Sequence, residues 1–351
     1  MSDALRIAVI GVGYLGQHHA RLLSAMEGVD LVGVADTKPG RAQQIAAKYA
    51  TAAFTDASQL AGRVDAVSIA SPTSTHLDVA LPFVEAGVPV LVEKPIASSL
   101  DDADRLLAAA TRRGTMVGTG HTERFNPAVA AALPLVAEPR FIEIHRLGTF
   151  PERSLDIDVI FDLMIHDLDL LLAMVRSEVV SIEAVGVNVL TPRVDIANAR
   201  LRFASGCIAN VTASRISRDR VRKARFFQKD SYVSIDYAAQ EVDVYRLLPR
   251  NGRPMIEGGR LEVINEEPLK RELEDFVAAV RAKRRPGVTG REGRDALELA
   301  TRVADAIAAN LTASVSGRAP TSASGIAPTT DSRLAPMSDS RLAPTNPQTH
   351  D

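Results

Sequence analysis

The sequence predicts a chain in two parts: an N-terminal doubly wound parallel α/β sheet, then an α+β part with a mainly antiparallel sheet. Short apolar segments alternate with helix-like stretches as far as Gly120, which is typical of parallel strands with helices on both faces. A glycine-rich turn, GVGYLG, directly follows the first apolar segment. After Asn126 several strand-like segments follow one another without helices between them, which is typical of an antiparallel sheet.

The first part is expected to alternate strand and helix along the chain. Its strands are short and rich in valine and isoleucine, which favour buried strands, and they are expected at Leu5–Ile10, Asp30–Ala35, Ala66–Ala70, Val88–Val92 and Thr115–Thr119. The helices expected between them are Tyr14–Met26, Gly40–Tyr49, His76–Ala86 and Leu100–Arg113. This order predicts a sheet with helices on both of its faces.

The second part is expected to open with a helix around Val159–Val175. The strands that follow are Val179–Leu190, Asn198–Phe203, Cys207–Arg215, Arg220–Phe227 and Tyr232–Asp236, and the closing helices are about Leu269–Lys283 and Arg291–Leu311. We predict one domain over 1–122 and a second over 123–315. An alternative is that the last helix packs back on the first domain. Residues 316–351 are rich in Ser, Thr, Pro and Ala and repeat DSRLAP, so they are predicted to be disordered.

The composition is that of a globular protein, with 46% hydrophobic and 24% charged residues in a chain of 351. A formal net charge of -2 argues against a nucleic-acid binder, which usually carries a basic excess. The single cysteine, Cys207, excludes an internal disulfide and a site of several thiolates. No basic and then apolar leader opens the chain, and no apolar run reaches the roughly 18 residues that span a bilayer. We therefore expect no membrane partner and predict a cytoplasmic location.

The turn from Gly11 to Gly16 carries the clearest chemical signal. A GxGxxG pattern alone is weak, but here it lies between a strand and a helix, as a Rossmann dinucleotide-binding domain requires. Gly11 permits the tight turn, Gly13 lets the backbone approach a pyrophosphate, and Gly16 allows the helix to pack on the strand. The N–H groups of the turn, which includes Tyr14 and Leu15, and the helix dipole would hold the anion. The alternative is that the glycines serve the turn alone.

Asp36 ends the second strand, twenty residues after Gly16. A carboxylate at this place accepts hydrogen bonds from the adenosine ribose and repels a 2′-phosphate, so NAD is the predicted cofactor rather than NADP. Lys38 and Arg41 lie close by in the sequence and keep NADP open as an alternative.

Glu93, Lys94 and Pro95 follow the apolar strand Val88–Val92. They are therefore expected at the carboxyl edge of the sheet, where ligands bind in open α/β folds. Pro95 removes a backbone donor and stiffens the turn, which would hold Lys94 in place. The alternative is an ordinary surface salt bridge before a turn.

The helix expected at Val159–Val175 is apolar nearly all round and still carries Asp162, His166, Asp167 and Asp169. Such a helix is buried, and buried charge is costly unless it is paired or used. Asp162 and His166 stand at i and i+4, so the carboxylate is expected to orient the imidazole and keep it basic, as a general base requires. The alternative is a satisfied Asp–His pair in the core. The other histidines lack metal-ligand spacing, and no metal is predicted.

Four motifs together resemble the Gfo/Idh/MocA family of sugar and cyclitol dehydrogenases, from about Leu5 to Leu311. They are the glycine-rich turn, Ser71-Pro-Thr-Ser-Thr-His76, Glu93-Lys94-Pro95 and Asp162-x-x-x-His166-Asp167. The resemblance implies that Lys94 contacts the nicotinamide ribose and the reacting hydroxyl, and that His166, paired with Asp162, accepts the proton. It implies a C-terminal open-faced antiparallel sheet that supports a homo-oligomer, commonly a dimer or tetramer. It also implies further cofactor-binding residues at Ser71, Pro72, Thr73, His76 and Glu93.

Three segments look like the branch of that family that oxidises the 3-hydroxyl of UDP-N-acetylglucosamine, or of its uronic acid, before a transaminase acts in lipid A pathways. They are Gly120-His-Thr-Glu-Arg-Phe-Asn-Pro127, Phe161–Leu170 and Ala213-Ser-Arg-Ile-Ser217. A UDP-sugar is therefore the expected substrate, bound by His166 and by Arg124, Asn126 and Arg153, because an arginine fork suits a diphosphate. The alternatives are ordinary surface charge for the arginines, a myo-inositol or free-sugar dehydrogenase, and a non-catalytic NAD-binding regulator.

Overall fold

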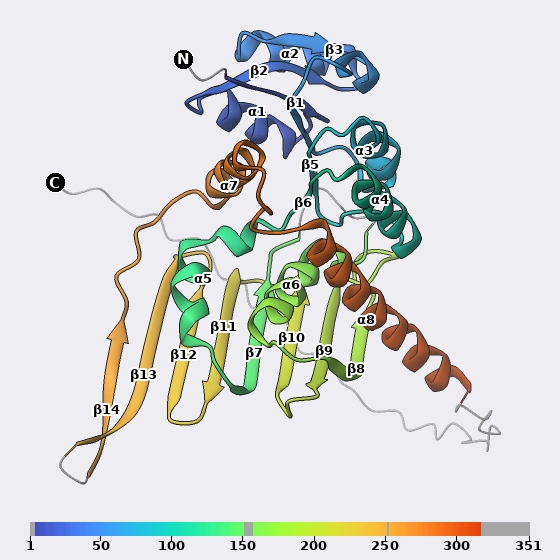
Figure 1. Cartoon of the computed structure of the whole chain (residues 1–351). Helices are drawn as coiled ribbons and strands as arrows, with labels where there is room; N and C mark the ends of the chain where they lie inside the picture. Colours follow the sequence, from blue (N-terminus) through green and yellow to red (C-terminus); the bar gives the residue numbers. More distant parts are fainter. Residues whose placement is uncertain (1–3, 151–156, 251–252, 317–351) are drawn as a thin grey trace, which may run out of the picture.

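The computed structural model describes residues 4–150, 157–250 and 253–316 (Figure 1). Its first sheet has six parallel strands in the order β3-β2-β1-β4-β5-β6, so the predicted doubly wound parallel sheet is confirmed. The strands are β1 (Leu5–Ile10), β2 (Val29–Ala35), β3 (Ala52–Phe54), β4 (Ala66–Ile69), β5 (Val90–Glu93) and β6 (Val117–Gly120). Five were predicted to within two residues at each end, and the three-residue edge strand β3 was not.

Helices cover both faces of this sheet, as the alternation predicted (Figure 1). They are α1 (Gly16–Ser24), α2 (Pro39–Lys48), α3 (His76–Glu85) and α4 (Leu100–Arg113). Helix α4 shows how the local sequence sets its ends. The Ser99 hydroxyl accepts a hydrogen bond from Asp102 N at the start, and Gly114 adopts a left-handed conformation at the end, with φ of 61°.

The second sheet has eight strands in the order β14-β13-β12-β11-β7-β10-β9-β8. They are β7 (Pro139–Leu147), β8 (Val179–Val187), β9 (Ile196–Phe203), β10 (Ile208–Ser214), β11 (Val221–Gln228), β12 (Ser231–Asp236), β13 (Glu241–Arg250) and β14 (Arg253–Arg260). The mainly antiparallel sheet is confirmed, with one parallel pair, β7 with β10. The sequence analysis left out β7, β13 and β14.

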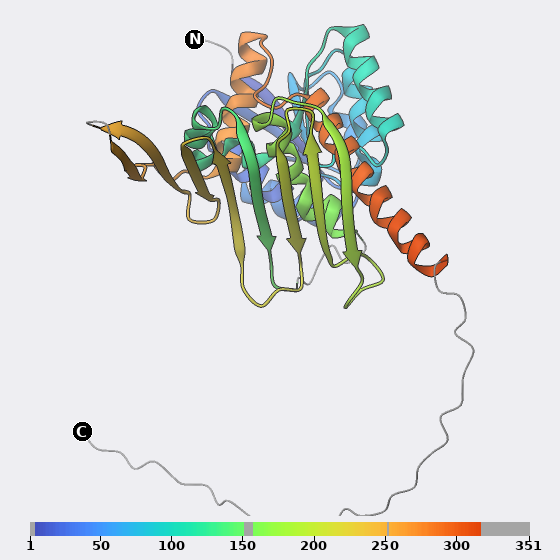
Figure 2. The same cartoon turned by 90° about the horizontal axis from the view of Figure 1, so that it is seen from below.

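One face of the second sheet packs on helices and the other is open (Figure 2). The covering helices are α5 (Pro127–Ala132), α6 (Ile165–Met174) and α8 (Gly290–Ser316). Strand β7 shows the alternation that follows from this arrangement. Ile142 and Ile144 are fully buried toward the helices, whereas Phe141 and Glu143 between them are only partly buried on the other face.

Two C-terminal helices return to the first sheet. Helix α7 (Pro268–Ala282) contributes Leu273, Phe276 and Val277 to a core shared with β1 and α1. Helix α8 begins with a capping box, in which the Thr289 hydroxyl accepts from Glu292 N and the Glu292 carboxylate accepts from Thr289 N. Side chains from the end of the chain therefore belong to the N-terminal core, and the division at residue 122 stays a prediction.

The helix predicted at Val159–Val175 is interrupted by a different geometry at its start. Residues Ile160–Met164 form a π-helical turn, η5, and only then does α6 begin. A π-turn has more residues per turn than an α-helix and is frequent at functional sites. The side chains on either side of it therefore lie at different relative angles from those that an uninterrupted helix would give.

Two parts of the sequence analysis fall outside the described residues: the predicted disordered tail, 316–351, apart from its first residue, and Arg153. Over the ranges that the structure does describe, no helix combines the length and apolar character needed to cross a membrane.

Candidate active site

The glycine turn has the geometry that a bound pyrophosphate requires. Gly11 has a φ of 80°, and a Cβ there would lie 2.5 Å from Ser71 N. A Cβ on Gly16 would lie 1.8 Å from the carbonyl oxygen of Gly11, so α1 packs too closely on the turn for any side chain. A Cβ on Gly13 would have no atom within 4 Å, so its backbone borders open space. Three glycines thus have three different roles, as dinucleotide binding predicts.

The turn borders a cleft of about 970 Å³ at the carboxyl ends of β1, β2 and β4. Its lining includes Gly11, Gly13, Tyr14, Leu15, Asp36, Ser71 and Pro72. Asp36 lies beside the turn, and its carboxylate accepts hydrogen bonds from Val12 N at 3.1 Å and from Lys38 N at 2.9 Å. These seven residues, all predicted to bind the cofactor, therefore lie around one cleft.

Arg41, which kept NADP as an alternative cofactor in the sequence analysis, forms hydrogen bonds within the protein. Its guanidinium donates to the carbonyl oxygens of Val12 and Gly13, at 2.6 and 3.1 Å, and to the side chains of Gln17 and Gln44. It therefore holds the glycine turn, which leaves it poorly placed to neutralise a 2′-phosphate. The geometry favours NAD over NADP.

His76 joins the two loops on either side of the cleft. It is buried, and its ring nitrogens lie 2.9 Å from the carbonyl oxygens of Ser71 and of Pro95. Burial lowers the pKa of His76, although the two carbonyls oppose the shift. Thr73, on the same loop, accepts a hydrogen bond from the Ser98 hydroxyl through its carbonyl oxygen. The contacts of His76 and Thr73 position the loop, and contact with cofactor stays a prediction for both.

Glu93 is buried behind Lys94 and bound to His19. Its carboxylate lies 3.0 Å from His19 Nε2, and His19 Nδ1 lies 2.7 Å from the Ser68 hydroxyl. Burial alone would raise the pKa of Glu93, but the hydrogen bond and charge of His19 lower it. Since the same carboxylate accepts from Lys94 N at 3.2 Å, this buried pair fixes the backbone that carries the lysine.

Lys94 reaches from the first sheet to the π-turn of the second part. Its ammonium donates to the main-chain oxygen of Asp162 at 2.6 Å and lies 3.5 Å from the Asp162 carboxylate. The lysine side chain is only 12% exposed. Lys94 and Asp162, both predicted as site residues and 68 positions apart in the sequence, are thus in direct contact, and their catalytic roles stay a prediction.

The predicted contact between Asp162 and His166 is corrected by the structure. Within the described ranges no hydrogen bond joins them, and His166 Nδ1 is buried without a partner. The physical reason is the π-turn that contains Asp162, because it removes the regular i, i+4 relation of an α-helix. The carboxylate faces Lys94 instead.

His166 lies in a buried and positively charged environment. Its ring meets that of His121 edge to face, with centroids 6.4 Å apart. Burial first, and then the charges of Lys94 and Arg146, lower the pKa of His166 well below its ordinary value. The imidazole is therefore neutral at neutral pH and has a lone pair available, which a general base needs.

The two buried aspartates of α6 are each neutralised by an arginine. Asp167 accepts two hydrogen bonds from Arg146, at 2.7 and 2.8 Å, and Asp169 accepts two from Arg124, at 2.7 and 3.1 Å. Arg146 also donates to Glu123 at 3.0 Å. These ion pairs hold η3 (Thr122–Phe125) and β7 against α6. Because each aspartate is paired with an arginine, the apolar helix can bury both carboxylates.

Two of the predicted substrate residues form hydrogen bonds within the protein, and their contact with substrate stays a prediction. Arg124 donates to Asp169 and to Glu292, so most of its fork is occupied. Asn126 is buried. Its side-chain Oδ1 accepts a hydrogen bond from Ala128 N and caps α5, and its side-chain Nδ2 donates to the main-chain oxygen of Tyr237. A signal for this was present in the sequence, since Asn followed by Pro at a helix start is a common cap.

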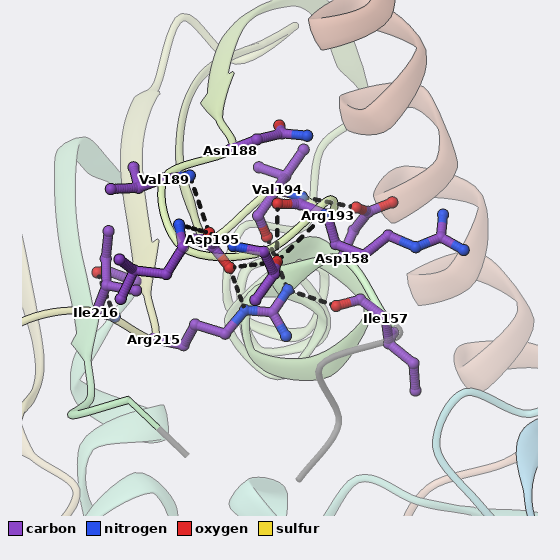
Figure 3. A network of polar contacts seen from close by, with 12 residues as sticks. Ile157, Asp158, Asn188, Val189, Arg193, Val194, Asp195, Arg215 and Ile216 are labelled. Atoms are coloured by element: carbon purple, nitrogen blue, oxygen red, sulfur yellow. Dashed lines mark hydrogen bonds and ion pairs between the residues drawn. The ribbon is translucent and has the colours of Figure 1, made fainter. Parts of the chain in front are cut away.

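A second buried network supports the start of the π-turn (Figure 3). Asp195 accepts from the N–H groups of Val189, Leu190 and Thr191 and lies 3.1 Å from Arg215 Nε. Burial would raise the pKa of Asp195, but hydrogen bonds from Thr191 and from the backbone lower it to about 2. Arg215 in turn donates to the carbonyl oxygen of Ile157, three residues before η5.

Arg146 and His19 were given no role by the sequence analysis, and Arg215 entered it only as part of the segment Ala213–Ser217. Arg146 lies on β7, the strand that was left unassigned, and Arg215 and His19 find their acids far away in the sequence. Across the described residues, no group of three or more His, Cys, Asp or Glu side chains is arranged to hold a metal ion.

Comparison with protein-family models places these features in one family. The NAD-binding Rossmann-fold model of the Gfo/Idh/MocA oxidoreductases matches residues 5–121, and the Gfo/Idh/MocA C-terminal domain matches residues 139–229. The chain belongs to the Gfo/Idh/MocA oxidoreductase family, as its motifs suggested, and it is an NAD-binding oxidoreductase.

Individual relatives narrow the comparison. The UDP-N-acetylglucosamine 3-dehydrogenase of Acidithiobacillus ferrooxidans is 39% identical over 312 residues, which is 88% of this chain and 98% of the relative. A solved structure of that enzyme superposes with a TM-score of 0.82 and covers 88% of this chain and 99% of its own. The inositol 2-dehydrogenase of Rhizobium meliloti is 27% identical over 336 residues, 89% of this chain and 99% of the relative.

Proposed function

We propose that this protein oxidises the 3-hydroxyl of UDP-N-acetylglucosamine to the 3-keto sugar with NAD. The observation that carries the proposal is that Lys94, at the carboxyl edge of the NAD-binding sheet, binds the π-turn just before His166 and acts on His166 through its charge, in a chain 39% identical to an enzyme with this activity. Inositol dehydrogenases match at lower identity, such as 27% for that of Rhizobium meliloti. We keep oxidation of a cyclitol as the second candidate.

NAD fits the residues of the cleft. Gly13 leaves open space beside the turn, Gly11 and Gly16 exclude side chains, and Asp36 offers a carboxylate for the ribose hydroxyls. When bound, NAD accepts the hydride from the carbon that carries the reacting hydroxyl. The protein's own residues must hold that carbon in place and remove the hydroxyl proton.

In the proposed mechanism the proton passes to His166. The neutral imidazole accepts it as the C–H bond breaks, which leaves a ketone, a reduced cofactor and one proton on the enzyme. Lys94 donates a hydrogen bond to the same oxygen and stabilises its developing negative charge, an effect that is strong where water is excluded. Asp162 positions the Lys94 ammonium through its main-chain oxygen, at 2.6 Å. The Glu93–His19 pair positions the backbone that carries the lysine.

Cofactor choice is tested at Asp36. Asp36→Ala is expected to weaken NAD binding by about tenfold or more, because a charged hydrogen-bond acceptor is lost. It is also expected to narrow the preference over NADP, because a repelling charge is lost. Asp36→Asn keeps a hydrogen-bond acceptor without the charge, so its affinity for NAD should lie between those of the wild type and Asp36→Ala. Titration of both cofactors into the three proteins measures this, and tighter binding of NADP than of NAD by the wild type would contradict it.

The wider role proposed is the supply of a 3-keto nucleotide sugar to a transaminase, in lipid A or other cell-surface glycan synthesis, in the cytoplasm. A panel of UDP-sugars, free sugars and inositols, each assayed with NAD by the absorbance of NADH, tests the substrate class. The expected result is turnover of UDP-N-acetylglucosamine well above that of every other compound. Faster turnover of myo-inositol would favour the second candidate.

We further propose that copies of this chain associate through the open face of the eight-stranded sheet (Figure 2). Phe141, Phe227, Tyr232 and Tyr245 form a row across four neighbouring strands, with ring centroids 5.7, 5.1 and 6.3 Å apart. A row of aromatic rings on an exposed sheet face is unusual for a monomer and typical of an interface.

Light scattering tests the association. The wild type is expected to have the mass of a dimer or tetramer, and Phe227→Glu is expected to shift it toward the monomer, because a charge would be buried in an apolar contact. Glu143→Gln, a change on the same face outside the aromatic row, is the control. A wild-type monomer, or an unchanged mass in a folded Phe227→Glu variant, would contradict the proposal.

A further inference from the structure

Arg222 differs from Arg124 and Arg146 because no carboxylate among the described residues forms an ion pair with it. On β11 it stands directly opposite Arg146 of β7 in the antiparallel register. Such paired residues share one face of the sheet, with Cβ atoms about 4.5–5.5 Å apart, and like charges there are destabilising. Two arginines at this position therefore cost stability unless anions compensate both.

Arg146 is fully compensated, whereas Arg222 is not. Arg146 bonds to Asp167 and Glu123, and its guanidinium lies over the Tyr237 ring, 5.4 Å from the centroid. The Arg222 side chain is exposed and, within the described part of the chain, forms no hydrogen bond or ion pair. Its backbone is nevertheless held, because its carbonyl oxygen accepts from Tyr237 N at 2.9 Å.

Charge at this position acts on the reaction centre. Arg146, which shares the face with Arg222, binds the residue next to His166. The charge of Arg222 is among those that lower the pKa of His166. Although the side chain is exposed, partial desolvation of its guanidinium and then the charge of Arg146 lower the pKa of Arg222, and Glu123 and Asp167 oppose the shift.

We propose that Arg222 binds the diphosphate of the nucleotide-sugar substrate, an inference that rests on the proposed function. The guanidinium has a planar fork of donors that can bond two phosphate oxygens at once. It is exposed, has no hydrogen-bond or ion-pair partner among the described residues, and lies on the same sheet face as the arginine that holds α6. A neutral cyclitol offers no group for it, so Arg222 determines specificity for a phosphorylated substrate.

The same placement links substrate charge to the base. A diphosphate beside Arg222 offsets the positive charges around His166, so its imidazole becomes a stronger base once the substrate is bound. A neutral sugar would leave those positive charges uncompensated. Arg222 thus contributes to binding directly and to the proton transfer through electrostatics.

Arg222→Ala and Arg222→Lys test the assignment, with Arg105→Ala as control. Arg105 is an exposed arginine of α4 whose removal changes the net charge equally. The probe is UDP, titrated by calorimetry into the NAD-loaded protein, and KM and kcat for UDP-N-acetylglucosamine are measured beside it. Thermal melting confirms that each variant is folded.

Arg222→Ala is expected to weaken UDP binding and raise KM by about 10- to 100-fold, since hydrogen bonds to a charged group are lost. Arg222→Lys keeps the charge without the planar fork of donors, so its UDP affinity and KM should lie between those of the wild type and Arg222→Ala. Arg105→Ala should have the UDP affinity and KM of the wild type. Unchanged UDP affinity in folded Arg222→Ala overturns the assignment, even if the pH dependence of kcat shifts. A wild type that binds UDP through Arg222 but does not oxidise UDP-N-acetylglucosamine supports this site and contradicts the proposed reaction.

Discussion

Lys94→Ala is expected to lower kcat for UDP-N-acetylglucosamine by at least about 10²-fold. The ammonium lies in a largely buried site, 2.6 Å from the main-chain oxygen of Asp162, and it is the donor available to a developing alkoxide. Loss of one preorganised donor at such an oxygen raises the barrier of the chemical step, so the effect should appear in kcat. Lys270→Ala, at an exposed lysine of α7, is the matched control.

Asp162→Asn separates the charge of Asp162 from its position. The strongest contact to Lys94 uses the main-chain oxygen, which asparagine retains, and the ion pair that is lost is long, at 3.5 Å. We therefore expect kcat to fall by less than about tenfold. Steady-state kinetics on Lys94→Ala, Asp162→Asn and the control Lys270→Ala measures kcat for each, and the largest decrease is expected for Lys94→Ala. A folded Lys94→Ala protein with wild-type kcat would show that the lysine has only a structural role.

His166→Ala is expected to lower kcat by about 10²- to 10⁴-fold, the usual range for the loss of a general base. Cofactor affinity should change much less, because His166 lies on α6 and does not line the cleft beside the glycine turn, where we propose that NAD binds. His166→Asn keeps a polar side chain without the basic nitrogen and should be nearly as inactive. Early melting together with normal turnover of the folded fraction would contradict the role as base.

The pH profile of the wild type tests the same residue without a substitution. Because burial and the charges of Lys94 and Arg146 lower the pKa of His166, the imidazole stays unprotonated at pH values well below 6.5. The acid limb of kcat/KM should therefore lie below pH 6.5, and activity should not change on that account between pH 6.5 and 8. An acid limb above pH 6.5 would contradict this environment for the base.

The N-terminal sheet and its cleft could be predicted because their signals are local in the sequence. The strand before Gly11, the spacing of the three glycines and the acid at Asp36 each depend on a few consecutive residues. The order of strands and helices then places Lys94 at the same edge of the sheet by the geometry of parallel strands. None of these steps needs information about distant contacts.

The relative orientation of Lys94, Asp162 and His166 could not be predicted in the same way. The i, i+4 rule placed Asp162 beside His166, but a π-turn over Ile160–Met164 directs the carboxylate to Lys94. Nothing in the local sequence marks that turn, since its residues also suit an α-helix.

Long-range ion pairs explain the other differences. Arg124 was assigned to substrate because its partners, Asp169 and Glu292, lie 45 and 168 residues away. Strand β7 was missed, and with it Arg146, so the sequence offered no reason to consider the charge opposite it on β11. Arginine forks choose their partners in the folded state, and a sequence alone does not distinguish one that is paired from one that is free.

The most direct test of the central claim is the fate of deuterium placed at C3 of UDP-N-acetylglucosamine. The purified protein is incubated with this substrate and NAD, and the reduced cofactor and the sugar are analysed by mass spectrometry. We predict that the deuterium appears in the reduced cofactor and that a 3-keto sugar forms in equal amount. Formation of NADH without deuterium, or no reduction at all, would contradict oxidation at C3 by this enzyme.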